Sequence, residues 1–280
     1  MTKDHWSDHL ILIVGVLFLL TPLWLLFASS THSVDTLIRE GLQWLPGGEG
    51  LAPYGQALTT ASGFTDTATG LRMLINSMIM GVGFAVGKII VSMAAAYALV
   101  YFRFPLATFL FWAIFCTLLL PLEVRIVPSY EVVSDLNLLN SYTGLIVPLI
   151  ASATATFYFR QFYKTVPNEL LEAATLDNAG PWRFFKDILV PLSRTMMAAI
   201  FIIMFVVGWN QYLWPLIMTT EEGYYTIVMG LKHILSVVRE GRVPEYNVAF
   251  ALVILAMLPP VAVVVLFQRW FIQGLVESEK

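Results

Sequence analysis

The long apolar stretches of this chain constrain its fold more than any other feature. A helix needs about 20 mostly apolar residues to cross the hydrocarbon core of a bilayer. Six stretches are long enough, and they lie at residues 10–28, 71–102, 106–128, 142–163, 196–218 and 247–271. Only helices and closed barrels satisfy their backbone hydrogen bonds in lipid. The sequence therefore predicts an all-α polytopic membrane protein in which residues 1–280 form a single transmembrane domain of six helices.

Composition supports this class and excludes others. The chain has 58% hydrophobic and 12% charged residues, whereas a soluble domain carries about 25% charged residues. A net charge of −3 gives no basis for nucleic-acid binding. The single cysteine, Cys116, excludes an internal disulfide, and the four scattered histidines predict no metal site.

The first apolar stretch, 10–28, is too long for the apolar core of a secretory signal, which has about 7–15 residues. We therefore expect an uncleaved first helix, kinked at Pro22. The polar loop that follows, 32–70, is the largest in the chain. Apolar residues at nearly helical spacing predict a short amphipathic helix within 33–45.

The second stretch contains the sequence GVGFAVGK, residues 81–88, which looks like a phosphate-binding loop. Such a loop requires glycine where this chain has Val82, and Ser or Thr where it has Ile89. No nucleotide site is predicted here. Gly83 and Gly87 instead form a small-xxx-small pair, which favours close contact between helices in lipid.

Between the fourth and fifth stretches lies a charged, helix-forming segment, residues 165–195, which we call the elbow. Its sequence predicts two short helices joined at a corner. Pro167 suits a first helical turn, Asn178 tolerates the left-handed conformation of a helix end, and Pro181 can begin the second helix. Pro191 is expected to end it. One side of the second helix is apolar, formed by Trp182, Phe184, Phe185, Ile188 and Leu189.

One side of the first elbow helix carries small side chains, so a groove on a partner protein could close around this thin side. Its members are spaced at i, i+3, i+4 and i+7: Leu170, Ala173, Ala174 and Asp177. Glu169 and Glu172 lie near the positive end of the helix dipole. Spacing alone leaves an ordinary amphipathic loop as an even alternative.

The elbow resembles the EAA loop of permease subunits of ABC importers. The likeness rests on Glu172-Ala173-Ala174, Asp177-Asn178-Ala179, Ile188 and Pro191-Leu192. In that family the loop is the coupling helix, which binds a cleft of a cytoplasmic ATPase subunit. The resemblance implies a role in ATPase coupling for Glu169, Leu170, Glu172, Ala173, Ala174, Asp177, Asn178 and Pro191. The family normally has glycine where this chain has Asn178, and we expect asparagine to keep the corner.

The resemblance extends over the second to sixth stretches. Residues 210–216 are similar to a motif of carbohydrate-type importer permeases, and residues 120–126, 151–162 and 274–280 resemble permeases for sn-glycerol-3-phosphate. It implies a non-catalytic subunit without a cofactor of its own. Its partners would be a second permease, two copies of an ATPase subunit that bind ATP and magnesium, and a periplasmic solute-binding protein. The implied solute is sn-glycerol-3-phosphate, with glycerophosphodiesters as a second class. A neutral sugar or oligosaccharide is the alternative.

Six spans place both termini on one side of the membrane. If that side is the cytoplasm, it carries nine Lys and Arg residues against six outside. This is a mild positive-inside bias, and it agrees with a cytoplasmic elbow in an inner-membrane protein.

Polar groups within spans usually face a cavity or a partner. The candidate pathway residues are Lys88, Glu123, Arg125, Asn210 and Gln211. Arg125 could attract an anion, or Glu123 and Arg125 could pair with each other or with interfacial water. Lys88 could line a cavity or bind a neighbouring helix. Asn210 and Gln211 could bind a hydroxylated solute stacked on a tryptophan, or cap a broken helix.

Two functions from other classes fit less well. A self-sufficient carrier would have more spans or an internal repeat, and it would not need the elbow. A membrane enzyme would need a nucleophile or an acid/base pair, and the sequence offers neither.

Overall fold

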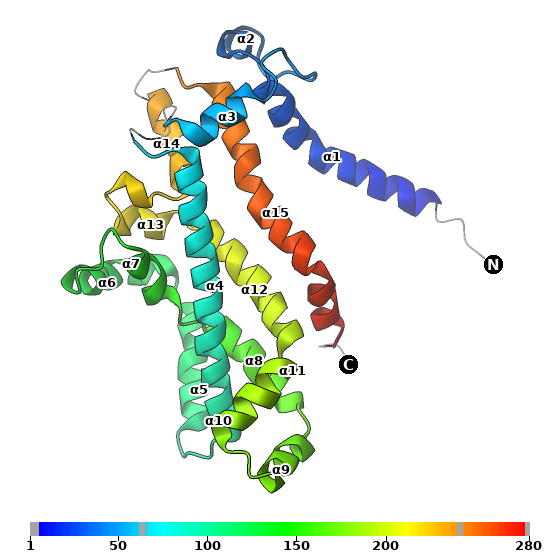
Figure 1. Ribbon diagram of the computed structural model, residues 1–280, viewed down its shortest axis with the longest axis vertical. Helices are drawn as coiled ribbons and strands as arrows, with labels where there is room; N and C mark the ends of the chain where they lie inside the picture. Colours follow the sequence, from blue (N-terminus) through cyan, green and yellow to red (C-terminus); the bar gives the residue numbers. More distant parts are fainter. Residues whose placement is uncertain (1–5, 62–64, 66, 240–242, 278–280) are drawn as a thin grey trace. The chain divides into compact units, whose positions relative to one another are not determined.

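Long helices dominate the computed structural model, which describes residues 6–61, 65, 67–239 and 243–277 (Figure 1). Three of them are long and apolar enough to cross a membrane: α1 (Trp6–Ser30), α4 (Gly70–Tyr101) and α15 (Tyr246–Glu277). Three bent helix pairs also pass this test. By length and composition the described residues therefore hold up to six spans. The predicted all-α class is confirmed.

The bent pairs differ from the continuous spans that the sequence predicted. The 106–128 stretch is divided among α5 (Ala107–Cys116), η1 (Thr117–Leu119) and α6 (Leu122–Asp135). The helix is bent by 106° between its two arms. Pro121 lies at this corner in an extended conformation. Proline has no N–H and disfavours helix in the residue before it, so the helix breaks there.

The second bent pair consists of α7 (Tyr142–Ile146) with η2 (Val147–Leu149) and of α8 (Ala153–Thr165). The bend between them is 50°. Ser152 begins α8, and its hydroxyl oxygen accepts a hydrogen bond from the N–H of Ala155. In the third pair, residues 181–192 meet α12 (Arg194–Trp209) at 72°.

Contacts divide the chain into two units, and two of the three boundaries between them fall inside the long helices α4 and α15. The first unit comprises residues 1–76 and 225–259, and the second comprises residues 77–224 and 260–280. The first holds α1, α2 (Val34–Glu40), α3 (Ala52–Thr59) and α14 (Ile227–Arg239). The second holds the elbow, most of α4, and the short helices α13 (Leu213–Met218) and η4 (Glu222–Tyr224).

In the first unit, hydrogen bonds attach the polar loop to the end of α1. The Thr31 hydroxyl accepts from the N–H of Gly47 at 2.6 Å, and the Ser29 hydroxyl accepts from that of Gln43 at 2.9 Å. The predicted amphipathic helix is α2. It stops before residue 45 because Gly41 adopts a left-handed φ of 77°.

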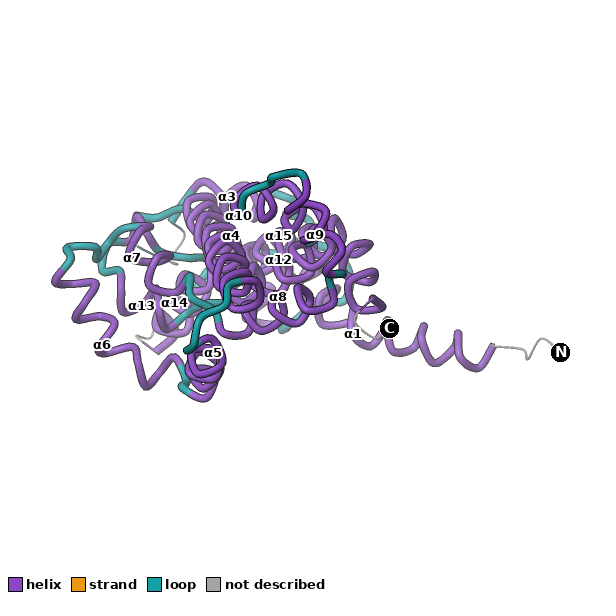
Figure 2. Tube along the Cα trace, turned by 90° about the horizontal axis from the view of Figure 1, so that it is seen from below, coloured by secondary structure: helices purple, strands orange, loops and turns teal. Residues whose placement is uncertain are grey.

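The second unit is built on close contacts made by the glycines of α4. A Cβ at Gly83 would lie 2.6 Å from Cδ1 of Ile146, and one at Gly87 would lie 2.5 Å from Cγ2 of Ile150. The predicted small-residue contact is confirmed. Gly208 of α12 similarly abuts the Phe84 side chain, so α4 and α12 lie side by side (Figure 2).

The predicted orientation includes three positive charges that lie outside the described residues: Lys3, Arg242 and Lys280. The last three residues of the segment 274–280, which carries part of the resemblance, also lie outside them.

Candidate functional site

The first helix of the elbow is α9 (Asn168–Leu176), which ends in a hydrogen-bonded corner. Pro167 precedes the helix as its cap, one position outside the predicted first turn. At the other end, the N–H of Ala179 donates to the carbonyl of Ala174 at 2.8 Å, and that of Asn178 donates to Thr175 at 3.1 Å. This is the Schellman arrangement. Asn178 has a φ of 50°, which confirms its predicted left-handed conformation.

The corner gives a direct test of the asparagine. We expect Asn178→Gly to keep full uptake, because glycine adopts positive φ freely. We expect Asn178→Val to lose most uptake, because a left-handed conformation costs an ordinary L-residue about 1–2 kcal/mol and a β-branched one more. Solute uptake is measured in proteoliposomes that hold equal amounts of each variant within the complete complex. Equal activity of the valine variant would contradict a need for this corner.

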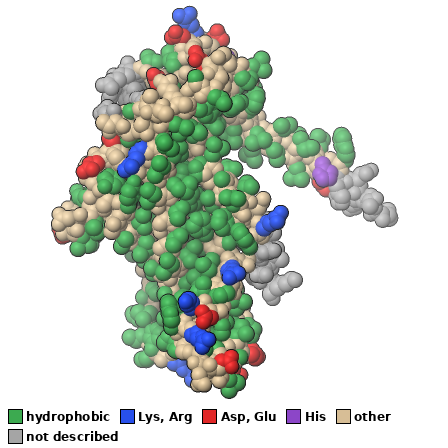
Figure 3. Space-filling model, in the orientation of Figure 1, with side chains coloured by type: hydrophobic (Ala, Val, Ile, Leu, Met, Phe, Trp, Pro, Cys, Tyr) green, Lys and Arg blue, Asp and Glu red, His purple; other side chains and the backbone are tan. Residues whose placement is uncertain are grey.

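The faces of α9 are only partly those predicted. Glu169, Glu172 and Ala173 are exposed, but Ala174 is 4% exposed and packs inward. The thin surface therefore does not include both alanines. Leu176, which the sequence did not single out, is 84% exposed at the tip. Figure 3 shows acidic and basic side chains gathered around this end of the unit.

The second helix of the elbow is longer and less regular than predicted. It begins at Pro181, as predicted, with α10 (Pro181–Phe184), and continues through a π-helical turn (Phe185–Leu189) into α11 (Val190–Leu192). Pro191 therefore does not end the helix. It has no N–H to donate within the helix, and the widened π turn precedes it. The chain bends two residues later, at Ser193, whose hydroxyl donates to the carbonyl of Leu189 at 2.6 Å.

The apolar side of this second helix is also smaller than predicted. Phe184 is 1% exposed and Leu189 is fully buried, whereas Trp182 is 72% exposed. Trp182 contacts only the ring of Phe185 among the described rings, with centroids 5.8 Å apart. Leu176 and Trp182 are the two most exposed of the elbow's four exposed large apolar side chains, the others being Leu170 and Leu192, and both suit a partner surface.

Aromatic contacts join the elbow to α4, and α4 to α8. The Tyr97 hydroxyl of α4 donates to the carbonyl of Pro181 at 2.9 Å, and its ring lies 5.0 Å from that of Phe185. Tyr101, one turn further along α4, lies 5.3 Å from the buried Phe184 and 6.2 Å from Tyr163 of α8. The elbow is therefore packed against α4, and Tyr101 joins α4 in turn to α8.

The sequence reasoning missed Tyr97 and Tyr101. Their signal was present, because two tyrosines four residues apart lie on one face at the end of an apolar stretch. Tyrosines at span ends usually mark the membrane interface, and nothing local indicates that these two contact the elbow.

Among the candidate pathway residues, Lys88 makes a structural contact. Its Nζ donates to the carbonyl of Ala151 at 3.3 Å and lies 4.3 Å from the ring centre of Phe84. Ser92 donates to the neighbouring carbonyl of Ser152 at 3.2 Å. Both carbonyls lie at the break before α8, and that of Ser152 also accepts from the N–H of Thr156 at 3.0 Å. The Lys88 side chain of α4 thus gives the Ala151 carbonyl a partner, as membrane interiors require.

Arg125 and Glu123 both lie exposed on α6. No ion pair joins these two described side chains, so the alternative in which they neutralise each other lacks support. Of the five candidates, Lys88 and Arg125 are the two described cations that lie near enough for their charges to interact.

Asn210 and Gln211 lie where α12 ends. The Asn210 side chain donates to the carbonyl of Val206 at 2.9 Å, so it caps the helix. Trp209 and Trp214 are 3% and 0% exposed, and the Trp214 indole donates to the carbonyl of Leu145 at 3.0 Å. Neither ring presents a face on which a solute could stack, so this part of the hydroxylated-solute interpretation has no support.

Comparisons with known proteins agree with this architecture. Residues 88–277 match the family described as binding-protein-dependent transport system inner membrane component. The chain is 48% identical over 275 residues, 97% of this chain and 96% of the other, to the sn-glycerol-3-phosphate transport system permease protein UgpE of Rhizobium meliloti. It is 49% identical over 272 residues, with the same coverage, to the protein of that name from Yersinia pestis.

Among solved structures, a bacterial ABC transporter involved in the import of the acidic polysaccharide alginate shares the fold. The TM-score is 0.79 at 19% identity, over 97% of this chain and 99% of that chain. The family match covers more than half of the sequence. This multi-pass chain therefore belongs to the inner membrane components of binding-protein-dependent transport systems, the permease subunits of ABC importers.

Proposed function

We propose that this chain forms half of the translocation pathway of an importer for sn-glycerol-3-phosphate, with glycerophosphodiesters as a second solute class. The observation that carries the proposal is the 48–49% identity, over 97% of the chain, to permeases named for that solute. The energy comes from ATP bound and hydrolysed on separate subunits, and the chain itself is not an enzyme.

The proposed assembly contains a second permease, two copies of an ATPase subunit and a periplasmic solute-binding protein. The elbow lies in the cytoplasm, as do both termini, in agreement with the charge bias of the loops. The exposed acids of α9, Glu169 and Glu172, and the two most exposed apolar side chains, Leu176 and Trp182, form the ATPase contact. When ATP closes the ATPase pair, α9 moves, and the Tyr97 contacts carry the movement into α4, which Tyr101 joins to α8.

The anionic solute is attracted by Arg125. Its guanidinium is exposed, unlike the Lys88 ammonium, which is 9% exposed and bonded to a carbonyl. An arginine presents two parallel N–H donors that match a phosphate. Lys88 adds positive potential without direct contact. Asn210 is assigned a capping role, and Gln211 remains a candidate for contact with the glycerol hydroxyls.

We expect Arg125→Gln to weaken the apparent affinity for sn-glycerol-3-phosphate by about tenfold or more, because hydrogen bonds to charged groups contribute about 1.5–3 kcal/mol. Glu123→Gln is the matched control, an exposed residue of the same helix whose loss of negative charge should leave the affinity unchanged or tighter. Uptake against solute concentration measures both. An unchanged half-saturating concentration in the arginine variant would assign Arg125 a purely structural role.

The solute itself is tested by ATPase activity. The complete complex is placed in phosphatidylethanolamine/phosphatidylglycerol vesicles with its binding protein, and ATP hydrolysis is measured with each solute. We expect stimulation by sn-glycerol-3-phosphate and none by maltose. Stimulation by maltose alone would replace the proposed solute by a neutral sugar. Uptake by this chain without partners, driven by an ion gradient, would instead identify a carrier.

A further inference from the structure

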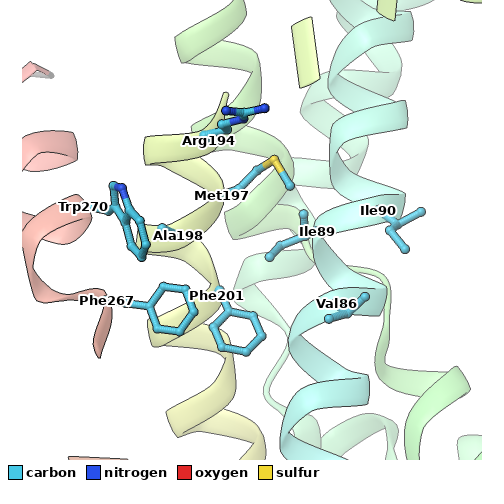
Figure 4. Close-up of a pocket in the computed structure, with 9 residues that line it drawn as sticks. All are labelled: Val86, Ile89, Ile90, Arg194, Met197, Ala198, Phe201, Phe267 and Trp270. Carbon is cyan, nitrogen blue, oxygen red and sulfur yellow. The ribbon is translucent and has the colours of Figure 1, made fainter. Parts of the chain in front are cut away.

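The second unit contains an apolar cavity that the transport proposal does not use. It lies among α4, α12 and α15 and has a volume of about 500 Å³, within the range of sites for small molecules (Figure 4). Its walls are almost entirely hydrocarbon, and Arg194 is the charged residue among its described lining.

The cavity has a polar end and an apolar end. Figure 4 places the Arg194 guanidinium and the indole nitrogen of Trp270 at one end, and Phe201, Phe267 and Val86 toward the other. The rings of Phe201 and Phe267 lie 5.3 Å apart. A cavity with one polar end and one apolar end suits an amphiphile, a molecule that has a polar headgroup and a hydrocarbon chain.

Arg194 has no compensating group within the described part of the chain. The structure gives its guanidinium no hydrogen bond or ion pair there, and Arg194 is the first residue of α12. The positive end of a helix dipole repels a cation at this position. An anion from outside the chain would satisfy both the side chain and the helix end.

We propose that this cavity holds an acyl chain of an anionic phospholipid whose phosphate binds Arg194. The guanidinium fork suits a phosphate, and an indole commonly lies at the headgroup level of a bilayer. Basic pockets between membrane helices on the cytoplasmic side are typical sites for anionic headgroups. Trp270 is 46% exposed and Ile90 62% exposed, so the rim is open to lipid. The assignment to the inner leaflet rests on the proposed cytoplasmic elbow.

The test uses the complete complex purified from membranes and equilibrated with equal amounts of phosphatidylglycerol and phosphatidylethanolamine. Native mass spectrometry then counts the lipids retained. We expect selective retention of phosphatidylglycerol. Arg194→Gln should lower it by about fivefold, the value of one cation near an anionic surface. Ala198→Trp, which fills the cavity, should reduce retention of both lipids.

Arg183→Gln is the matched control. It removes the same charge from a neighbouring position, but Arg183 pairs with Asp187 at 3.6 Å and lies outside the cavity. Its retention should equal that of the wild type. Adding sn-glycerol-3-phosphate or inorganic phosphate should not displace the lipid, because neither has a chain to fill the cavity.

The proposal would be overturned by equal retention of the two lipids, by unchanged retention in Arg194→Gln, or by release of the lipid by inorganic phosphate. A cross-link between a Trp270→Cys variant and the second permease would do the same, because protein would then cover the cavity. Lipid retention is independent of solute, so failure of sn-glycerol-3-phosphate to stimulate ATP hydrolysis would refute the transport proposal and leave this one standing.

Discussion

Replacing Glu172 by lysine abolishes uptake while the chain still inserts into the membrane: this is the largest effect that we expect. Glu172 is exposed on α9, so the substitution removes no contact within the described fold. The lysine loses a favourable interaction with the helix dipole. It also places a reversed charge in the proposed contact with the ATPase subunit, and we expect this to lower the affinity of that contact by about 30-fold or more. Uptake and the amount of chain in the membrane fraction are measured together.

Asp187→Lys is the control for Glu172→Lys. It makes the same charge reversal in the same elbow, on the second helix, and disturbs only an exposed pair with Arg183. Such pairs contribute little to stability. We expect this variant to retain most uptake. Normal uptake by Glu172→Lys, or equal loss in both variants, would refute a specific contact on α9.

The second large effect concerns force transmission. We expect Tyr97→Ala to lower uptake by at least about tenfold, while ATP hydrolysis by the assembled complex continues. The substitution removes the hydrogen bond to Pro181 and the ring contact with Phe185. Loss of a packed aromatic side chain costs about 3–5 kcal/mol when it is buried, and less for this half-buried one. The elbow can then move without moving α4, so the ratio of solute imported to ATP hydrolysed falls.

Two companion variants separate the parts of this contact. Tyr97→Phe keeps the ring and loses one hydrogen bond, a contribution of about 0.5–1.5 kcal/mol, so we expect an intermediate ratio. Tyr158→Ala removes an exposed tyrosine of α8 that lies away from the elbow, and the ratio should stay unchanged. If ATP hydrolysis and uptake fell in parallel in Tyr97→Ala, the residue would act on assembly or stability and not on transmission.

Local chemistry predicted much of the elbow. Asn178 and Pro181 stand where a helix must end and another must begin, and the structure gives each the predicted conformation. Gly83 and Gly87 likewise indicated a close helix contact. In each case the residue type itself restricts the backbone or the space around it, so distant parts of the chain are not needed to make the inference.

The remaining features depend on distant residues. The sequence predicts a continuous span through Pro121, and the 106° corner there depends on how α6 packs as well as on the proline. Trp182 fits an apolar face by spacing, yet Tyr97 and Tyr101 pack on Phe184 and Phe185 and leave Trp182 exposed. Periodicity identifies a face without identifying what covers it.

The same limit applies to the candidate pathway. Lys88 could not be assigned because its partner, the carbonyl of Ala151, lies 63 residues away. Arg125 and Lys88 are 37 positions apart, and only the fold brings them near each other. Asn210 was equally consistent with a cap and with a solute contact until the carbonyl of Val206 was found 2.9 Å away.

Site-directed cross-linking tests the coupling role of the elbow most directly. In a Cys116→Ser background, two single-cysteine variants are made: Leu176→Cys at the tip of the elbow and Trp44→Cys in the loop after α1, both at exposed positions. We predict that the thiol at position 176 cross-links to the ATPase subunit, in a manner that ATP alters, and reacts with an impermeant thiol reagent only in inside-out vesicles. The thiol at position 44 should react only from the outer side. Labelling of position 176 from outside, or no cross-link in the intact complex, would contradict the account.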